Sequence, residues 1–249
     1  MASSDVTYPP LDTLKPVADN LWIVDSGPIQ ASGLSLPVRM SVIRLGSGEM
    51  WLHSPTRYDA RLRDEIEAIG PIRHLVAPNV AHWTFLKQWQ AHCPQAETSA
   101  APNLRERAQV KAAGVRLDHD LHDASPSDWS GEIEQTIVPG GFGFREVAFL
   151  HRPSRTLLLT DLIQNLEPEK LPLGTRLFAA ATGGSGGTTP IYLRLALHAR
   201  QADAAAAVRQ MINWAPERVI ITHGRFYERD GTRELKRAMA WLVGSGRSS

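Results

Sequence analysis

Three side chains that can bind a metal each follow a short apolar run in this chain. They are His82, a few residues past Ile72–Val76; Asp161, directly after Arg155–Thr160; and His223, directly after Arg218–Thr222. Apolar runs of this length, rich in branched residues, are typical of buried β-strands. Because ligand sites in layered α/β proteins gather at strand ends, we expect the three side chains to lie close together.

Two imidazoles and one carboxylate are enough to hold a divalent ion with positions left open for water and substrate. We therefore assign His82, Asp161 and His223 as ligands of one divalent metal, with zinc, iron or manganese as candidates. Each residue also has an ordinary interpretation: a histidine after a strand is commonly just hydrogen-bonded, and Asp161 can cap the next turn. The sequence is therefore also consistent with a protein that binds no metal.

The order of strand-like and helix-like segments predicts the fold class. Strands are expected at 20–25, 39–45 and 50–53, followed by strands and helices in alternation, with helices over 56–69 and 103–113. A similar series follows in the second half, with a flexible loop over 179–190. This order favours two mixed β-sheets packed face to face with helices outside, an αββα sandwich. We expect a flexible N-terminal arm over 1–15, a single domain over 16–243 and a flexible tail over 244–249.

Composition limits the classes of partner. The chain has 249 residues with 27 basic and 26 acidic side chains and a net charge of +1, which gives no electrostatic reason to expect nucleic acid or a membrane surface. No apolar run approaches the ~20 residues of a membrane-spanning helix. The lone Cys93 excludes an internal disulfide and a cysteine-based zinc site, and a reducing cytoplasm is the expected location.

Several phrases of the sequence resemble the metallo-β-lactamase superfamily, and more closely an uncharacterised branch of it defined as a domain of unknown function. The phrases are Leu52-His53-Ser54-Pro55, Ala77-Pro78-Asn79, Phe149 to Leu157, Leu159-Thr160-Asp161-Leu162 and Thr222-His223-Gly224. The resemblance covers roughly residues 15–243 and implies the αββα fold. It also implies the His-x-His-x-Asp-His signature at 77–82, of which only His82 remains.

The resemblance implies which metal positions survive. Superfamily members typically hold two metals, and the ligands of the first fall here on Ala77, Asn79 and the loop around Pro139 to Phe142, which has no histidine. The ligands of the second metal fall on Ala81, His82, Asp161 and His223. Only the aspartate of the signature, at Ala81, is missing from this set. The lost aspartate is the usual proton shuttle of hydrolytic members, and a mononuclear site is what the remaining residues imply.

Two further residues are candidates for the chemistry. His53 is expected to point into the cleft as a fourth ligand or a base, with a core histidine as its equally supported alternative. Asn79 stands in a ligand position and is expected to orient a water molecule or a substrate carbonyl. With Asp161, these form the expected catalytic set. By contrast, Asp118 to Asp123 is interpreted as a solvated acidic loop, and Gly183 to Gly187 as a mobile lid.

The sequence supports three competing functional hypotheses. The first is a metal-dependent enzyme that acts on a small organic substrate by hydrolysis, lyase chemistry or ring opening. The second is a catalytically inactive, metal-free binding or structural protein of the same fold. The third is a metal-free enzyme that uses His53 and His223 as acid and base with Asp161. The expected partner is a small molecule, with a homodimer left open.

Overall fold

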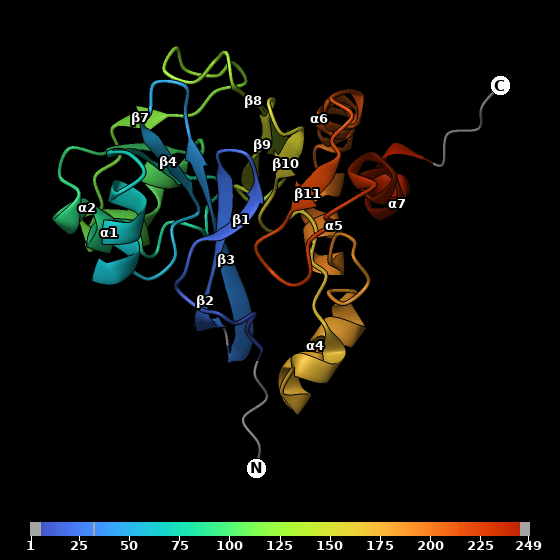
Figure 1. Ribbon diagram of the computed structural model, residues 1–249. Helices are drawn as coiled ribbons and strands as arrows, with labels where there is room; N and C mark the ends of the chain where they lie inside the picture. The colour runs from blue at the N-terminus through green and yellow to red at the C-terminus, as the bar shows by residue number, and fades with distance from the viewer. Residues whose placement is uncertain (1–5, 32, 245–249) are drawn as a thin grey trace.

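The computed structural model describes residues 6–31 and 33–244. Within these residues the strands form two sheets that lie face to face, and helices cover the two outer faces (Figure 1). The expected αββα sandwich is confirmed. The outer parts of the expected arm and tail, 1–5 and 245–249, lie outside the described residues.

The first sheet changes from antiparallel to parallel halfway across. Its order in the described chain is β1 (Lys15–Ala18), β2 (Leu21–Ala31), β3 (Leu34–Arg44), β4 (Met50–His53), β5 (Ile72–Ala77), β6 (Glu97–Ala100) and β7 (His119–Asp120). Pairing is antiparallel from β1 to β4 and parallel from β4 to β7. Helices α1 (Ala60–Glu67), α2 (Leu86–His92) and α3 (Ala108–Ala113) pack their buried residues on its outer face.

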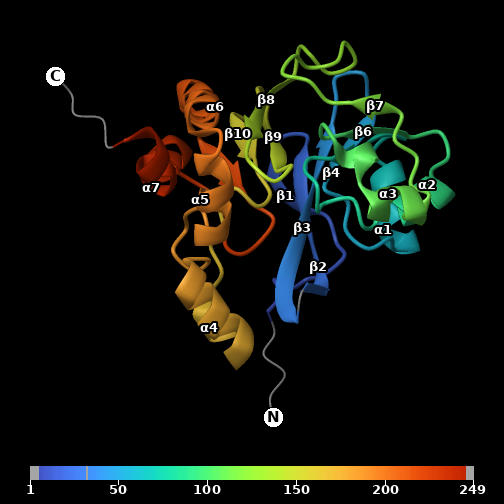
Figure 2. The ribbon, with the colours of Figure 1, turned by 180° about the vertical axis from the view of Figure 1, so that it is seen from behind.

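The second sheet is smaller and carries two of the three expected ligands. Its order in the described chain is β11 (Arg218–Ile220), β10 (Thr156–Leu158), β9 (Arg145–His151) and β8 (Ile133–Pro139). Helices α5 (Ile191–His198), α6 (Gln201–Asn213) and α7 (Gly231–Val243) cover it. Seen from behind, α4 (Leu173–Thr182) extends away from this layer towards the end of β2 and β3 (Figure 2).

Large apolar side chains from both sheets form the core between them. Trp51 of β4 and Phe149 of β9 are fully buried and meet edge to face, with ring centroids 5.2 Å apart. Leu158 of β10 and Ile220 of β11 belong to the same cluster. Burying such side chains stabilises the fold by about 1.5–3 kcal/mol each. The sheets are therefore fixed relative to each other, and so are the loops at their strand ends.

Several elements differ from the sequence expectation. The helix expected over 56–69 begins only at Ala60, because the side chain of Asp59 accepts a hydrogen bond from Leu62 N at 2.9 Å and caps it. The helix expected over 103–113 is broken, because Arg107 has an extended backbone that separates Leu104–Glu106 from α3. Helix α4 occupies part of the segment that was expected to be a loop.

The chain is packed from Val6 onwards. Val6 is 2% exposed, and the Tyr8 ring lies 5.3 Å from the guanidinium of Arg39. Residues 6–14 therefore lie against the domain, where the sequence predicts a flexible arm. In the described part of the chain, no helix has both the length and the hydropathy that crossing a bilayer requires.

Candidate metal centre

A cavity of about 300 Å³ lies where the strand ends of the two sheets meet. The β2–β3 hairpin, the loop after β5 and helix α5 form its sides. His82, Asp161 and His223 all line it. The sequence placed these three side chains at separate strand ends, and the fold brings them into one cavity.

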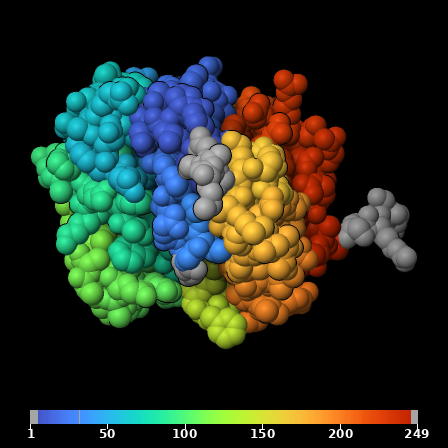
Figure 3. All heavy atoms as spheres, turned by 90° about the horizontal axis from the view of Figure 1, so that it is seen from below, coloured from blue at the N-terminus to red at the C-terminus, as the bar shows by residue number. Residues whose placement is uncertain are grey.

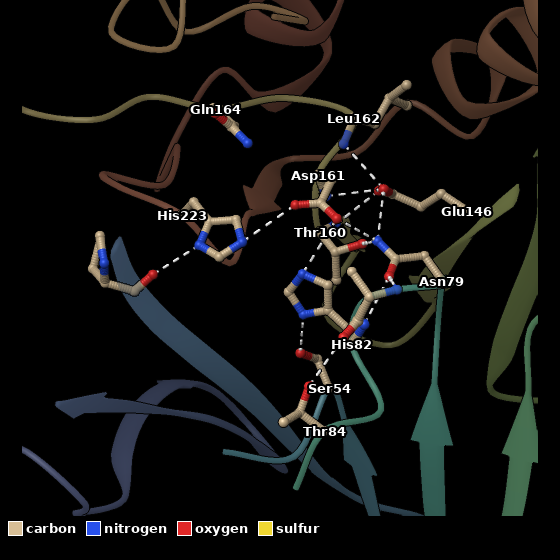
Figure 4. A network of polar contacts seen from close by, with 12 residues as sticks. Ser54, Asn79, His82, Thr84, Glu146, Thr160, Asp161, Leu162, Gln164 and His223 are labelled. Atoms are coloured by element: carbon tan, nitrogen blue, oxygen red, sulfur yellow. Dashed lines mark hydrogen bonds and ion pairs between the residues drawn. The ribbon is translucent and has the colours of Figure 1, made fainter. Parts of the chain in front are cut away.

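The three side chains converge on Asp161. His82 Nε2 lies 3.4 Å from Asp161 Oδ2, and His223 Nε2 lies 3.2 Å from Asp161 Oδ1 (Figure 4). One ligand atom from each residue lies within 4.8 Å of the others, and within the described chain this is the group that could hold a metal ion. Ligand atoms about 2.1 Å from a tetrahedral ion are about 3.4 Å apart. Each contact is close to that spacing, and the two histidines face different oxygens of the Asp161 carboxylate.

Each imidazole is oriented by a hydrogen bond on its other nitrogen. His223 Nδ1 lies 2.7 Å from the carbonyl oxygen of Pro37, and because a carbonyl can only accept, Nδ1 must donate. His82 Nδ1 lies 2.7 Å from Ser54 Oγ. Partners of this kind fix the ring orientation of metal-binding histidines.

The hydrogen bond to Pro37 decides what His223 presents to Asp161. In a neutral imidazole whose Nδ1 carries the proton, Nε2 carries a lone pair and no hydrogen. That lone pair then faces a carboxylate oxygen at 3.2 Å, which is an unfavourable contact between two acceptors. Either a cation between the two atoms or a second proton on the ring removes the conflict. The residues present therefore fit a divalent cation.

Asn79 holds Asp161 and the loop before His82 at the same time. Its Nδ2 donates to Asp161 Oδ2 at 2.7 Å, and its Oδ1 accepts from the backbone nitrogens of Ala81 at 2.8 Å and His82 at 2.9 Å. These bonds fix which end of the amide faces Asp161. Since an amide NH₂ group cannot ligate a cation, the structure places Asn79 as a positioning residue. The sequence expectation was a group that orients water or substrate.

Glu146 on β9 supports the site through hydrogen bonds, and the sequence interpretation missed it. It is fully buried, and it accepts hydrogen bonds from the backbone nitrogens of Thr160 at 2.8 Å, Asp161 at 2.9 Å and Leu162 at 3.0 Å. Its carboxylate thus holds the loop that carries Asp161 (Figure 4). The available signal was a single acid within the apolar run of β9, since acids are almost never fully buried without partners.

The charged groups of the site shift one another's pKa values. Burial alone would raise the pKa of Asp161, but the charges and hydrogen bonds of His82 and His223 outweigh burial and hold this pKa well below its usual range. Burial would lower the pKa of His223, but the hydrogen bond and charge of Asp161 raise it. Burial and the charge of Asp161 raise the pKa of Glu146. Asp161 is therefore an anion at neutral pH.

His53 lies behind the site and not in it. Its side chain is 2% exposed, stacks on Trp51 with ring centroids 5.8 Å apart and meets Phe149 edge to face. Burial, with the nearby charge of His82, lowers the pKa of His53 to about 3. Within the described chain its Nε2 atom has no hydrogen-bond partner. The structure thus favours the core interpretation over the role of base or fourth ligand.

The other sequence candidates lie in ordinary structural settings. Asp118 and Asp120 pair with Arg116 and Arg105, each at 3.0 Å, so the acidic loop is neutralised by neighbouring cations. The glycine-rich segment follows α4, and Gly184 N closes the end of that helix by donating to Ala179 O at 2.8 Å. Neither segment contributes to the metal-competent group found in the described chain.

The positions at which the resemblance implies a first metal carry no histidine or carboxylate. Ala77 is a buried residue at the end of β5, and Asn79 is committed to the contacts above. The loop after β8 packs on α5 through Gly141 N, which donates to Ala196 O at 2.7 Å. The described site is therefore a single three-residue set.

Comparison with known proteins now identifies the family. The family described as Domain of unknown function (DUF4336) matches residues 18–182. The chain belongs to this family. The match covers β2 to β7 of the first sheet and the loops that carry His82 and Asp161, and it stops before His223. No curated protein sequence matches.

Solved structures confirm the superfamily resemblance at the level of the fold. A metallo-β-lactamase from Pontibacter korlensis is 13% identical, with a TM-score of 0.62 over 94% of this chain and 99% of that one. One from Hirschia baltica is 15% identical, with a TM-score of 0.61 over 93% and 97%. FIM-1 from Pseudomonas aeruginosa, in its mono-zinc form, is 18% identical, with a TM-score of 0.60 over 93% and 94%. This chain has the metallo-β-lactamase fold.

Proposed function

We propose that this protein is a metal-dependent enzyme that holds one divalent cation with His82, Asp161 and His223. The observation that carries the proposal is the 3.2 Å contact between His223 Nε2 and Asp161 Oδ1, made while Nδ1 of the same ring donates to Pro37. Two nitrogens and one carboxylate suit zinc, and equally iron or manganese. The mono-zinc form of one structural relative supports a site of this size.

The chain's own residues supply the geometry. Ser54 and the Pro37 carbonyl set the two imidazole planes, while Asn79 and Glu146 fix the Asp161 carboxylate and its loop. A bound divalent ion would supply Lewis acidity, which polarises a substrate carbonyl or activates a water molecule. The reaction we propose is hydrolysis, in which water adds to a substrate carbonyl carbon and the bond from that carbon to its leaving group breaks, releasing an acid and the protonated leaving group.

The proposal is tested by metal content and thermal stability. Protein purified without chelator should contain close to one equivalent of a transition metal by elemental analysis, and added zinc should raise the Tm of metal-free protein by mass action. His82→Ala should lose both effects, while His122→Ala, which changes an exposed histidine outside the site, should keep both. Less than a tenth of an equivalent, with no zinc-dependent Tm shift, would refute the metal site.

A metal-free binding protein is the alternative that one observation favours. If a second proton resides on His223, the contact with Asp161 becomes a charge-assisted hydrogen bond without any metal. Chelator treatment would then leave the Tm unchanged, and ligand binding would persist. The third hypothesis, with His53 as acid or base, receives no support from geometry because His53 is buried among aromatic rings.

A further inference from the structure

The walls of the cavity away from the three metal-competent residues are mostly apolar. The wall residues used below are Ile29 and Leu36 of the hairpin, Val80 and Phe85 after β5, Phe144 before β9 and Leu193 of α5. Apolar walls with a few convergent polar groups are the usual form of a site for a small organic molecule. The ligand's polar group must therefore lie at the His82–Asp161–His223 end.

Among the described residues that line the cavity, none is a lysine or an arginine. Two arginines that are next to lining residues in sequence are held by other contacts. Arg194 donates to Thr189 O at 2.8 Å and lies over the Trp241 ring, and Arg145 donates to Gly140 O and Phe144 O at 2.6 Å. A carboxylate or phosphate in the body of the ligand would therefore be buried without a cationic partner, which is strongly unfavourable.

Tyr192 supplies a neutral polar contact at the opening. Its hydroxyl accepts a hydrogen bond from Gln164 Nε2 at 3.0 Å, and both residues line the cavity. Burial and the charge of Asp161 raise the pKa of Tyr192 to about 12, so the hydroxyl keeps its proton at neutral pH. That proton can be donated to a ligand oxygen. Because Tyr192 is also 43% exposed, the cavity reaches the surface beside α5.

The surface around this opening is also apolar. Leu173, Leu177 and Phe178 of α4 and Ile191 and Leu195 of α5 are exposed, and the Phe178 and Tyr192 rings lie 6.2 Å apart. The segment 171–202 contains no acidic residue and three arginines, Arg176, Arg194 and Arg200. Viewed from below, this yellow-to-orange segment lies beside the blue β2–β3 hairpin (Figure 3). An approaching apolar ligand therefore meets apolar side chains both outside and inside the opening.

We propose that the substrate is an uncharged carbonyl compound with an aliphatic or aromatic body. Its carbonyl lies at the His82–Asp161–His223 end and its body lies against Leu36, Val80 and Leu193. This substrate class rests on the proposed function. The cavity selects against negative charge in the part of the substrate that is distant from the reacting carbonyl.

A matched pair of esters tests the proposal. Methyl octanoate and monomethyl suberate share the chain length and the ester, but the second carries a carboxylate at the far end. Calorimetric titration of the full-length protein, before and after chelator treatment, should give a Kd at least tenfold lower for methyl octanoate. Equal Kd values, tighter binding of monomethyl suberate, or no binding of either ester would overturn the proposal.

A gain-of-function variant shows whether the charge preference arises in this cavity. Leu36→Arg places a cation on the cavity wall and should tighten the binding of monomethyl suberate at least tenfold. Gln30→Arg is the matched control, because Gln30 is exposed on the same hairpin and does not line the cavity. It should leave the preference unchanged. The same response in both variants would mean that binding occurs elsewhere.

The metalloenzyme proposal and the proposal about the substrate class can be refuted independently. Selective binding of methyl octanoate by a protein with no metal and no turnover would refute the metalloenzyme and keep the ligand class. Metal-dependent turnover of monomethyl suberate in preference to methyl octanoate would refute the ligand class and keep the metalloenzyme.

Discussion

At the scale of single residues, the Asp161 carboxylate is held by more contacts than a surface aspartate would need. Asn79 donates to one oxygen, two histidines face the carboxylate, and Glu146 binds the backbone around it. A group positioned in this way loses little freedom when it binds a ligand. Each contact can be removed by one substitution, which makes its contribution measurable.

Asn79→Ala should weaken metal binding without removing a ligand. The substitution frees Asp161 Oδ2 and leaves the backbone nitrogens of Ala81 and His82 without their acceptor. Loss of a partner outside the ligand set typically costs 10- to 100-fold in metal affinity. Competition with a chelating dye measures this affinity. Asn213→Ala, at an exposed position in α6, is the control, and unchanged affinity in Asn79→Ala would contradict the role.

His53 should make the protein less stable as the pH falls. Its pKa is about 3 in the folded protein and about 6.5 when unfolded, so between these values the unfolded state binds one more proton than the folded state. The free energy of unfolding therefore rises with pH there, by about 1.4 kcal/mol per unit from this residue. Urea titrations from pH 4 to 7 should show a shallower dependence for His53→Phe.

The control for this prediction is His122→Ala, because His122 is exposed and its removal should leave the pH dependence of unfolding as it is in the wild type. An unchanged slope in His53→Phe would mean that His53 becomes protonated in the folded protein. His53 would then have access to solvent or to a negatively charged partner.

At the scale of elements, the backbone beside a metal-competent residue is packed closely against neighbouring segments. Gly224 follows His223 with φ at +102°, and a Cβ atom there would lie 2.1 Å from the carbonyl oxygen of Asn165. The buried Arg39 of β3 donates to Ile221 O and Gly224 O, both at 2.8 Å. The loop after β11 is therefore held from both sides, by the loop after β10 and by the first sheet.

Gly224→Ala should destabilise the fold and displace His223. Its left-handed backbone and the clash with Asn165 together predict a loss of at least about 2 kcal/mol in the free energy of unfolding. Zinc affinity should fall at least tenfold because His223 moves with the loop. Gly131→Ala is the matched control, since a Cβ atom there meets nothing within 4 Å. Equal stability of the two variants would show that the loop adapts.

At the scale of the whole molecule, the metal-competent set joins the two halves of the sandwich. His82 comes from the loop after β5 of the first sheet, while Asp161 and His223 follow β10 and β11 of the second. The His223 hydrogen bond to Pro37 in β3 also crosses between the sheets. A cation bound here would therefore act as a link between the layers.

Zinc should slow amide hydrogen exchange in both sheets at once. Binding to the folded state alone stabilises it by about 2.7 kcal/mol when free metal is 100 times the Kd. Residues 79–82, 160–162 and 222–224 should therefore all become more protected when zinc is added to metal-free protein, as measured by mass spectrometry. Protection confined to one sheet, or seen equally in His82→Ala, would contradict a shared ligand set.

Sequence patterns predicted many of the elements and the three metal-competent residues of this chain. The segments 72–76 and 218–220 are strands because branched side chains favour extended backbone, and the polar residues Asn79 and Thr222 follow them within three positions. The resemblance to a known fold then predicted the sandwich. Local signals were weaker for the short strands β6 and β7 and for α4, where packing against the rest of the domain decides the structure.

Only the tertiary structure decided what each candidate residue faces. His53 and Ser54 are neighbours in sequence, yet His53 points into the aromatic core and Ser54 contacts His82. Successive side chains leave a strand on opposite faces, and the sequence does not reveal which face the second sheet covers. Glu146 is 15 residues from Asp161 in sequence and becomes its support only because β9 lies beside β10. Long-range pairing of this kind determines the site.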